Sequence, residues 1–430
     1  MNQNCEIRAR WIWCVDRPPI ENAGLLIVDG HATLIDRPSA QAIDLWDVCI
    51  VPAFVNAHTH LEFSDLQNPI AYESTFASWI ANVLAHRRKQ HEAQPPSSFQ
   101  SARRQTILQG LQESWRAGCA TIVDMVTEPW SVEDIFASDR SLQNRSLHSL
   151  PNWESELTLF ALPEVLGVVA ERASRTLKFA QQVQANHHSE QSALAVRFGV
   201  SPHAPYSTPV GLVEQSVQLA NQNNQLVSMH LAETREEIEF LEQGTGPLAD
   251  MLSRFAPSPV TFVPRSIQDY LQILSTAKRS FVVHGNYLTA ENIAFIQRHR
   301  DHMAVVYCPR THAYFQHEPH PWIELLDQGI QVFLGTDSLA SNPDLNILSE
   351  ARFLFQQHPS ADPNVLLSMI TVRPETFLSS VSREALASPK TFAVVPCDAR
   401  TSSEVGSSLL SGTEPAVPLS LQIQRRLQSN

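Results

Sequence analysis

The chain has 430 residues, which is long enough for a barrel of about 250 residues with additions. Hydrophobic residues make up 43% and charged residues 17%, as in a soluble globular protein. The formal net charge of −13 argues against a nucleic-acid phosphate surface, which needs clustered Lys and Arg, but leaves room for a local basic pocket that binds a small anion.

The cysteines and the lack of long apolar runs indicate the cellular compartment in which the protein is expected. The six cysteines are scattered and form no Cys-x-x-Cys pair, so we expect reduced, buried thiols. The first ten residues hold no apolar stretch typical of a signal peptide. No run approaches the ~20 apolar residues of a bilayer span. We therefore expect a cytoplasmic protein that binds neither nucleic acid nor membrane.

Short strands are predicted at the beginning of the chain. The stretches 7–15 and 24–28 are apolar but too few to hold a core, so residues 1–50 are expected to form part of a small β domain. Residues 381–430 are expected to return to this domain, with one strand at 392–395. The rest of that segment is predicted to be partly irregular, and its last dozen residues poorly ordered.

Between these ends, at 51–380, short apolar runs alternate with longer amphipathic stretches. This alternation predicts parallel βα units, and eight of them fit a (β/α)8 barrel. A doubly wound open sheet is the rival. The barrel is favoured because polar residues follow several strands, at the end where barrel enzymes carry their active residues. The predicted strands are 51–57, 119–125, 157–169, 194–200, 226–231, 280–284, 303–307 and 332–336, and the predicted helices are 76–88, 101–117, 170–185, 209–221, 236–241 and 290–298.

Three of these strand ends offer candidate metal ligands. His58 and His60 are two apart, so on a strand both rings share one face about 7 Å apart at the backbone. His230 ends another apolar run, and Asp337 follows the last strand. The alternatives are two hydrogen-bonded structural histidines and, for Asp337, a helix N-cap, a role that Ser338 can also fill.

Glu233 is the candidate proton carrier. It lies three residues after His230, in the loop or in the first helical turn that follows the strand. A carboxylate at this place can move a proton between water and a substrate nitrogen. The alternative is that Glu233 belongs, with Arg235, Glu236 and Glu237, to an acidic helix start favoured by the helix dipole.

Two further histidines end predicted strands. His284 precedes Gly285 and can bind the metal or orient the attacking water. His203 lies between Pro202 and Pro205, which stiffen its loop, and is predicted to contact substrate. A structural core role is the alternative for both.

These residues together resemble the amidohydrolase superfamily. The branch that they resemble contains cytosine, guanine and S-adenosylhomocysteine deaminases and triazine hydrolases. The matching stretches follow the order found in that superfamily across about 290 residues, and they are 52–63, 201–206, 230–241, 283–288 and 334–342.

The resemblance implies a (β/α)8 barrel with a β-sandwich built from both chain ends. It implies that Glu233 is a proton shuttle and that His284 lies beside the hydrolytic water and the substrate. It also implies one divalent ion, Zn²⁺ before Fe²⁺, bound by His58, His60, His230 and Asp337.

A less specific likeness is to aminodeoxyfutalosine deaminases, which act on a purine nucleoside. It makes Glu62 and His203 candidate substrate contacts, while Trp79 fits a helix core better because its apolar neighbours have helical spacing. Arg310 and His312, after the seventh strand, vary among relatives and are candidates for specificity.

Two departures from the superfamily pattern matter. The stretch 383–398 lacks the usual Gly- and Lys-containing return to the sandwich, which puts the C-terminal half of that domain in doubt. The fourth strand, 194–200, holds no lysine that could bridge two metals, so we expect one ion.

The expected reaction is hydrolytic deamination of an aminated heteroaromatic ring, for example a purine nucleoside. The expected partner is a small-molecule substrate, and a homodimer is left open. Removal of halide or alkylamine from a substituted ring by the same site is one alternative, and a non-catalytic metal-binding protein is another. A serine hydrolase ranks low because no Gly-x-Ser-x-Gly turn occurs.

Overall fold

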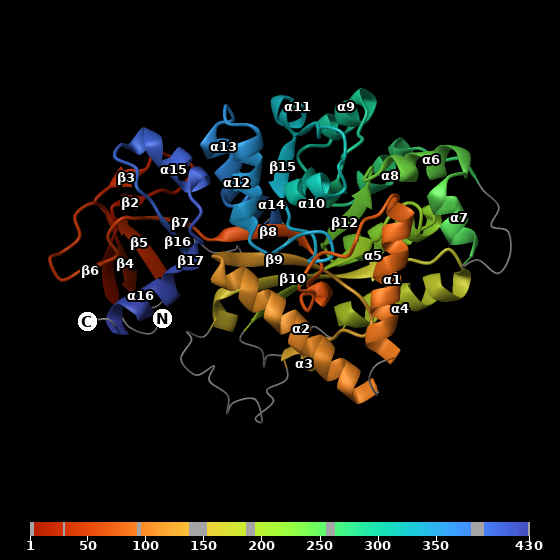
Figure 1. Ribbon diagram of the computed structural model, residues 1–430, viewed down its shortest axis with the longest axis horizontal. Coiled ribbons are helices and arrows are strands. Elements are labelled where there is room, and N and C mark those ends of the chain that lie inside the picture. Colours follow the sequence, from red (N-terminus) through yellow and green to blue (C-terminus); the bar gives the residue numbers. More distant parts are fainter. Residues whose placement is uncertain are drawn as a thin grey trace.

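The main body of the molecule is a barrel, with smaller sheets at one end (Figure 1). The computed structural model describes residues 4–28, 31–92, 96–136, 153–185, 194–254, 263–379 and 391–428.

Eight parallel strands form the barrel wall, in the order β15-β14-β13-β12-β11-β10-β9-β8. The first and last strands meet through a parallel bridge between Thr59 and Asp337. The predicted (β/α)8 barrel is therefore confirmed, and the open sheet is excluded. The strands are β8 (Phe54–Thr59), β9 (Cys119–Val126), β10 (Thr158–Val165), β11 (Ala195–Pro202), β12 (Leu226–Leu231), β13 (Ser280–His284), β14 (Met303–Tyr307) and β15 (Gln331–Leu334).

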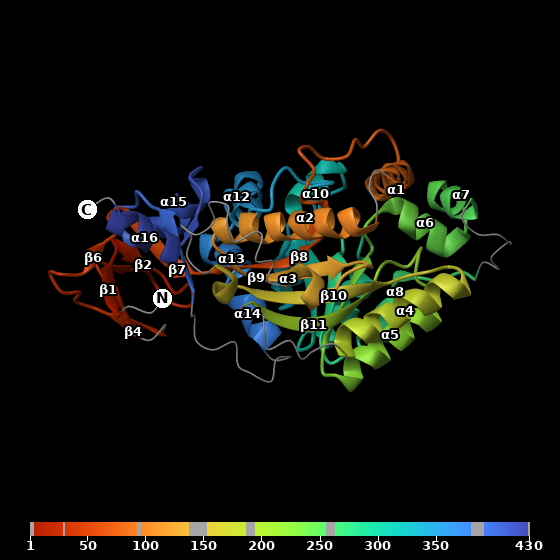
Figure 2. The same cartoon turned by 90° about the horizontal axis from the view of Figure 1, so that it is seen from below.

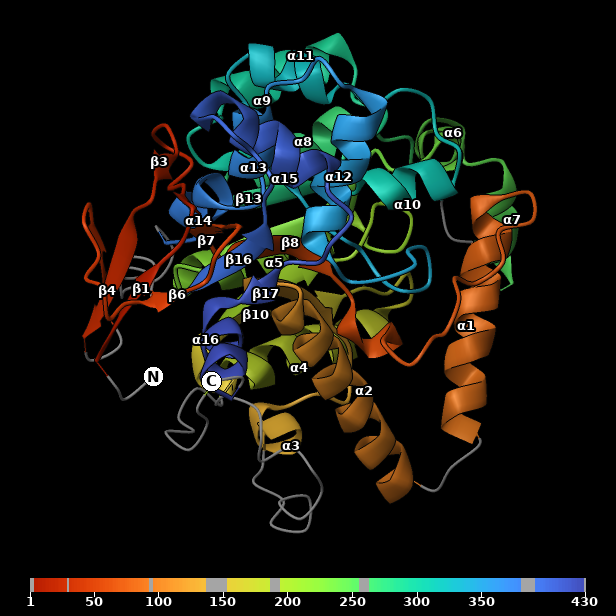
Figure 3. The same cartoon turned by 60° about the vertical axis from the view of Figure 1, so that its left-hand side comes forward.

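Helices cover the outside of the barrel, and α1 and α7 lie side by side at one edge (Figure 3). Among the described residues, no helix combines the length and the apolarity that a bilayer span requires. The helices are α1 (Phe76–Glu92), α2 (Pro96–Arg116), α3 (Val132–Phe136), α4 (Ala170–Ala185), α5 (Val210–Gln222), α6 (Arg235–Gln243), α7 (Pro247–Ser253), α8 (Ile267–Leu274), α9 (Ala290–Arg298), α10 (Pro309–Tyr314), α11 (Trp322–Asp327), α12 (Ile347–Gln357), α13 (Pro363–Ser368), α14 (Val372–Ser379), α15 (Val405–Ser411) and α16 (Leu419–Gln428).

Two smaller sheets at one end of the molecule contain the N-terminal strands (Figure 2). Two strands from the C-terminal part of the chain join one of these sheets. One sheet has the order β5-β4-β1-β6 and the other β17-β16-β7-β2-β3. Residues of both sheets and of α16 share one apolar cluster, so they pack as a unit. Their strands are β1 (Cys5–Arg8), β2 (Trp11–Ile12), β3 (Ile20–Glu21), β4 (Gly24–Val28), β5 (His31–Ile35), β6 (Ile43–Asp44), β7 (Val48–Pro52), β16 (Phe392–Pro396) and β17 (Val417–Pro418).

The C-terminal part of the chain is more regular than its composition predicts. The strand expected at 392–395 is confirmed as β16, which pairs antiparallel with β7. The expectation of a poorly ordered end is wrong up to residue 428, because α16 occupies Leu419–Gln428. Leu419 and Ile423 on one face of α16 join the core of the small sheets, and this burial holds the helix in place.

The strand predicted at 51–57 is in fact two strands, because the backbone changes partners at Ala53. The Ala53 N–H donates to the Thr391 carbonyl, on the side of the small sheets, while the Phe54 N–H donates to the Gly118 carbonyl of the barrel. Pro52 has no N–H to continue the ladder. Both strands are fully buried, so the apolar sequence pattern is continuous and does not mark the boundary between them.

Candidate active site

The structure brings the four predicted metal ligands together at the carboxyl ends of the barrel strands. Nitrogen atoms of His58, His60 and His230 lie within 4.8 Å of one another. The Nε2 atoms of His60 and His230 are 3.2 Å apart. Oδ1 of Asp337 lies 3.7 Å from Nε2 of both His58 and His60. These side chains come from β8, the turn after it, β12 and the turn after β15.

A local irregularity lies next to the first two histidines. The pairing of β8 with β9 changes register between Asn56 and Thr59. Such bulges re-aim side chains and are frequent beside active sites. His58, inside the irregular stretch, is completely buried, and its ring lies edge-on to the rings of His60 and His230 at 4.9 Å.

The donor atoms of this cluster suit a divalent cation. Both ring nitrogens of His58 and Nδ1 of His60 are buried without a hydrogen-bond partner among the described residues. Burial lowers the pKa of both rings well below the usual histidine value, so both are neutral. His230 Nδ1 donates to the His203 carbonyl at 2.8 Å, which leaves Nε2 as the free electron-pair donor. Neutral imidazoles with one carboxylate are typical zinc ligands.

Hydrogen bonds hold Asp337 both at its backbone and at its carboxylate. Its N–H donates to the His58 carbonyl at 3.0 Å, and Thr59 Oγ1 donates to its carbonyl at 2.8 Å. Ser341 Oγ donates to its Oδ2 at 3.2 Å. Burial raises the pKa of the Asp337 carboxyl to about 7. The helix that follows is capped by Asn346, so Asp337 is not the helix N-cap considered as the alternative.

Glu233 lies in the turn after β12 and faces His284. Its Oε1 is 3.5 Å from His284 Nε2. Burial, with repulsion from Asp337 and Glu237, raises the pKa of the Glu233 carboxyl well above its usual value. Burial lowers the pKa of His284 well below 6.5. Both shifts favour the uncharged forms of the pair, and a carboxyl that retains its proton beside an imidazole suits proton delivery.

The acidic residues after Glu233 do more than favour their own helix. Thr234 caps α6 through the Glu237 N–H. Glu237 is completely buried, and its two carboxylate oxygens accept the N–H groups of Ala232 and Glu233 at 3.0 and 2.8 Å. Glu236 accepts the first two N–H groups of a different helix, α1. Glu236 and Glu237 do lie in the first turn of α6, as the helix-dipole interpretation expected, but their carboxylates bind backbone N–H groups outside that helix.

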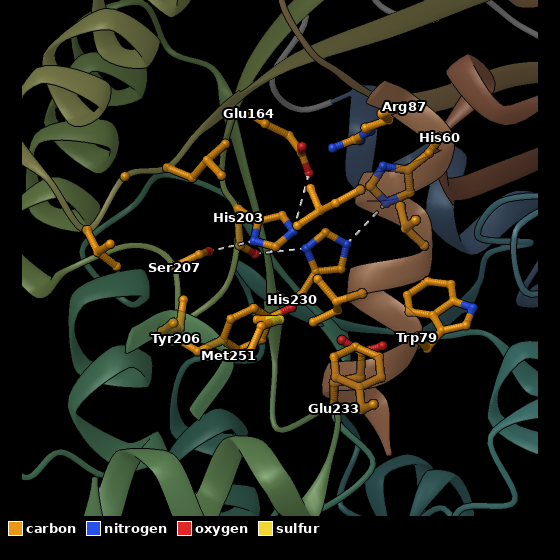
Figure 4. Close-up of a pocket in the computed structure, with 18 of the residues that line it drawn as sticks. His60, Trp79, Arg87, Glu164, His203, Tyr206, Ser207, His230, Glu233 and Met251 are labelled. Atoms are coloured by element: carbon orange, nitrogen blue, oxygen red, sulfur yellow. Dashed lines mark hydrogen bonds and ion pairs between the residues drawn. The ribbon is translucent and has the colours of Figure 1, made fainter. Parts of the chain in front are cut away.

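A cavity of about 410 Å³ opens beside these residues (Figure 4). His60, His230, Glu233, His284 and Asp337 line its inner part. The outer wall is apolar, with residues of α1 and α7, while arginines of α1 and α4 also contribute. The residues of this outer part include Phe76, Trp79, Ile80, Val83, Arg87, Arg88, Arg172, Met251 and Leu252.

Trp79 packs against other aromatic side chains and also lines the cavity. Its ring stacks on Phe76 with centroids 5.6 Å apart and meets Phe315 edge-on at 4.9 Å, as expected for a residue that packs inside the protein. It also lines the cavity and is only partly buried. The aromatic cluster therefore forms one wall of the cavity rather than a separate core.

Two predicted substrate contacts bind other protein groups. Glu62 is paired with Arg87 and Arg103 and also accepts from Thr127 Oγ1. Arg310 is paired with Asp344 and Glu350. Neither is among the described residues that line the cavity. A substrate role for either stays a prediction, as does one for His312, whose Nε2 contacts the Glu318 carbonyl.

His203, the third predicted contact, does line the cavity, and beside it lies a residue that the sequence analysis missed. Glu164 of β10 is 3% exposed, and its Oε1 is 4.0 Å from His203 Nε2. A signal was available, since Glu164 is the one charged residue in the apolar stretch 157–169. Arg87, Arg172 and Tyr206 were missed as well, without such a signal.

Comparison with known families decides the classification of the chain. Residues 49–380 match the amidohydrolase family. The chain belongs to the amidohydrolase family. This assignment confirms the resemblance that the strand-end histidines and Asp337 suggested.

The relatives of this amidohydrolase include nucleoside deaminases. A 5-methylthioadenosine/S-adenosylhomocysteine deaminase of Pyrococcus furiosus is 24% identical over 376 residues, 84% of this chain and 78% of that protein. Aminodeoxyfutalosine deaminase of Deinococcus radiodurans is 28% identical over 335 residues, 74% and 70% of the two chains. A solved adenosine deaminase from Xanthomonas campestris with bound Zn superposes with a TM-score of 0.67 at 18% identity, covering 100% of this chain and 98% of that chain.

Proposed function

We propose that this amidohydrolase removes the amino group of a purine nucleoside by hydrolysis and releases ammonia. The observation that carries the proposal is the convergence of three neutral imidazoles and the Asp337 carboxylate beside a protonated Glu233, inside one cavity. The three relatives described above are named for deaminations of adenosine or of nucleosides related to it, which supports the same reaction class.

The metal of the proposed reaction is one divalent ion held by His58, His60, His230 and Asp337. Zinc is the first choice, because the donor set suits it and the Xanthomonas structure holds Zn. Fe²⁺ is the second choice. When bound, such an ion lowers the pKa of a water molecule toward ~7, so that hydroxide is available at neutral pH.

Glu233 supplies the proton for the attacked ring. Because burial keeps its carboxyl protonated, it donates to the ring nitrogen next to the carbon that bears the amine, and that carbon becomes more electrophilic. Asn286 Nδ2 donates to the Glu233 carbonyl at 2.9 Å and helps to hold the loop in position. The deprotonated carboxylate then takes the second proton of the water, now on the hydroxyl added to the carbon, and delivers it to the amino nitrogen. The C–N bond breaks, ammonia leaves and the new C–O bond becomes a carbonyl, while the proton held by Asp337 returns to Glu233 through solvent.

Asp337 and His284 act on the attacking water. Both side chains line the inner cavity, and Asp337 accepts the proton that the water loses as its oxygen forms the new bond to carbon. His284 Nε2 faces the same space, and His320 Nε2 contacts the His284 carbonyl at 2.8 Å, which helps to fix the backbone of His284 in its left-handed conformation with φ 69°. The overall change exchanges one amino group for one carbonyl oxygen.

The test is ammonia release over a panel of compounds, with metal content measured on the same sample. The panel contains adenosine, 5′-methylthioadenosine, S-adenosylhomocysteine, aminodeoxyfutalosine, adenine, cytosine and a chlorotriazine. Release from at least one purine nucleoside, in proportion to bound metal, supports the proposal. Release of halide alone, or metal binding without turnover on any compound, contradicts it and favours the alternative leaving group or a non-catalytic protein.

A further inference from the structure

Glu164 and His203 face each other across the cavity wall without a hydrogen bond between them. Oε1 of Glu164 is buried and has no hydrogen-bond partner among the described residues. It lies 4.0 Å from Nε2 of His203, too far for a direct hydrogen bond. The two residues are held together by the backbone, because the His203 N–H donates to the carbonyl of Val165, the neighbour of Glu164.

A hydrogen bond on one side of the His203 ring leaves its other nitrogen facing Glu164. Nδ1 of His203 lies 2.6 Å from Ser207 Oγ, so Nε2 is the ring nitrogen directed toward Glu164. Both side chains line the cavity, and a buried polar atom without a partner, such as Oε1 of Glu164, is costly. A ligand that brings hydroxyl groups to this point can bond to both side chains, because a hydroxyl both donates and accepts.

A second metal ion is the rival occupant, since ligand atoms of Glu164, His203 and His230 also lie within 4.8 Å of one another. His230 is not available to such an ion. Its Nδ1 donates to the His203 carbonyl, and its Nε2 lies 3.2 Å from Nε2 of His60. Only one carboxylate and one imidazole would remain, fewer than the three protein ligands of catalytic zinc sites.

The position of Glu164 fits the part of the substrate away from the reacting amine. In Figure 4, Glu164 and Glu233 lie on opposite sides of His230, and both line the same cavity. A nucleoside whose base reaches Glu233 carries its sugar away from that residue. A carboxylate can accept two hydroxyl groups at once, and two adjacent hydroxyls on a five-membered ring present such a pair.

We infer that Glu164, with His203 beside it, is the specificity-determining contact for the vicinal diol of a ribonucleoside substrate. This inference rests on the proposed function and extends it by naming the sugar. It excludes free bases and 2′- or 3′-deoxynucleosides as preferred substrates.

The experiment compares adenosine with 2′-deoxyadenosine and 3′-deoxyadenosine, or the ribo- and deoxy-forms of whichever adenosine derivative is turned over. We expect the wild-type protein to prefer the ribo-form by about ten- to a hundredfold in kcat/KM, the loss expected for one or two charge-assisted hydrogen bonds. Glu164→Gln should lower kcat/KM for the ribo-form by a similar factor and leave the deoxy-forms unchanged. Glu171→Gln, an exposed change of equal charge on α4, is the matched control.

Three results would overturn the inference. The first is equal wild-type rates on ribo- and deoxy-forms, which needs no variant and therefore holds even if Glu164→Gln fails to fold. The second is an equal loss on both forms in Glu164→Gln, which indicates a structural role. The third is a loss of one metal ion per chain in that variant, which indicates the second metal site.

A binding measurement separates failure of this inference from failure of the proposed function. Calorimetry with inosine and 2′-deoxyinosine, the products of deamination, requires no turnover. Tighter binding of inosine to wild type, with the difference lost in Glu164→Gln, supports the Glu164 contact even if no ammonia is released. Ammonia release from nucleosides without any ribo preference leaves the proposed function intact and removes the Glu164 contact.

Discussion

The carboxylate of Glu237 accepts the backbone N–H of Glu233 at 2.8 Å and that of Ala232 at 3.0 Å. Ala232 has a left-handed backbone with φ 55°, a strained state for a residue with a side chain. One buried side chain thus accepts hydrogen bonds from two backbone N–H groups in the turn that carries the proposed proton shuttle. We therefore expect Glu237 to be a positioning residue, which would act on the proposed reaction through Glu233.

Glu237→Gln is expected to slow turnover without removing the metal. A glutamine has one acceptor oxygen, so its NH₂ group would face one of the two N–H groups and shift the turn. We expect kcat to fall about tenfold, equal to about 1.4 kcal/mol of transition-state stabilisation, with metal content unchanged. Steady-state kinetics and metal analysis check this, with exposed Glu242→Gln on the same helix as control. An unchanged kcat would contradict the positioning role.

Stability should depend on pH through the same residue. Burial raises the pKa of Glu237 from 4.5 to about 7. As pH rises between these values the unfolded chain loses this proton while the folded chain keeps it, so the free energy of unfolding falls with rising pH. The slope for one proton is at most about 1.4 kcal/mol per pH unit. The free energy of unfolding is measured with denaturant at pH 5, 6 and 7 for wild type and for Glu237→Gln. The difference between the two proteins should change with this slope, and a difference that stays constant with pH would refute the prediction.

Glu233→Gln separates proton transfer from metal binding. Glutamine keeps the shape of the side chain but carries no acidic proton, so ammonia release should fall by about a thousandfold, within the range for a general acid–base group. Bound metal should remain at the wild-type level, because Glu233 is not among the proposed ligands. Ammonia assays with elemental analysis measure both. A variant that keeps a near-normal rate would remove Glu233 from the mechanism.

Metal removal should affect both stability and activity. A ligand that binds only the folded state stabilises it, by about 4 kcal/mol at a thousand times its Kd. A chelator should therefore lower the melting temperature and stop ammonia release, and added zinc should restore both. In His58→Ala, zinc should restore neither, whereas the exposed His31→Ala should behave as wild type. Full recovery of His58→Ala with zinc would show that the ion binds elsewhere.

Substitution of Arg310 tests whether this residue determines substrate specificity or stabilises the folded protein. Its guanidinium pairs with Asp344 and with Glu350, which is completely buried. Arg310→Met would leave Glu350 without its cation, so we expect a loss of about 3 kcal/mol or more in unfolding free energy. Arg310→Met/Glu350→Gln should recover part of it. Ratios of kcat/KM between two substrates should stay constant, and a change in these ratios would support the predicted role in specificity.

The barrel and the clustering of His58, His60, His230 and Asp337 could be predicted because their signals are local. Eight apolar runs alternate with helical stretches, and polar residues such as His230 and Asp337 follow the runs directly. Since parallel strands end at one edge of the barrel, residues after different strands had to meet there. The sequence order of these ends was enough to infer the cluster.

Other features depend on contacts between distant residues and left no local pattern. Glu236 caps α1, which lies about 160 positions earlier in the chain. Glu62 was predicted to contact substrate, but in the structure its carboxylate forms ion pairs with Arg87 and Arg103. The change of sheet at Ala53 was hidden because both flanking strands are buried. Partner choice in these cases is decided by tertiary packing.

The contacts that join the first and last strands of the barrel also place the fourth residue of the proposed metal site. Thr59 and His58 from the first strand bind the backbone of Asp337, which lies 278 positions after Thr59. During synthesis, the imidazoles of His58, His60 and His230 therefore exist long before their carboxylate partner emerges. A chain that ends before Asp337 has neither the bridge that joins the first and last barrel strands nor the carboxylate of the proposed four-ligand site, so we expect that site to form only after the eighth strand has docked.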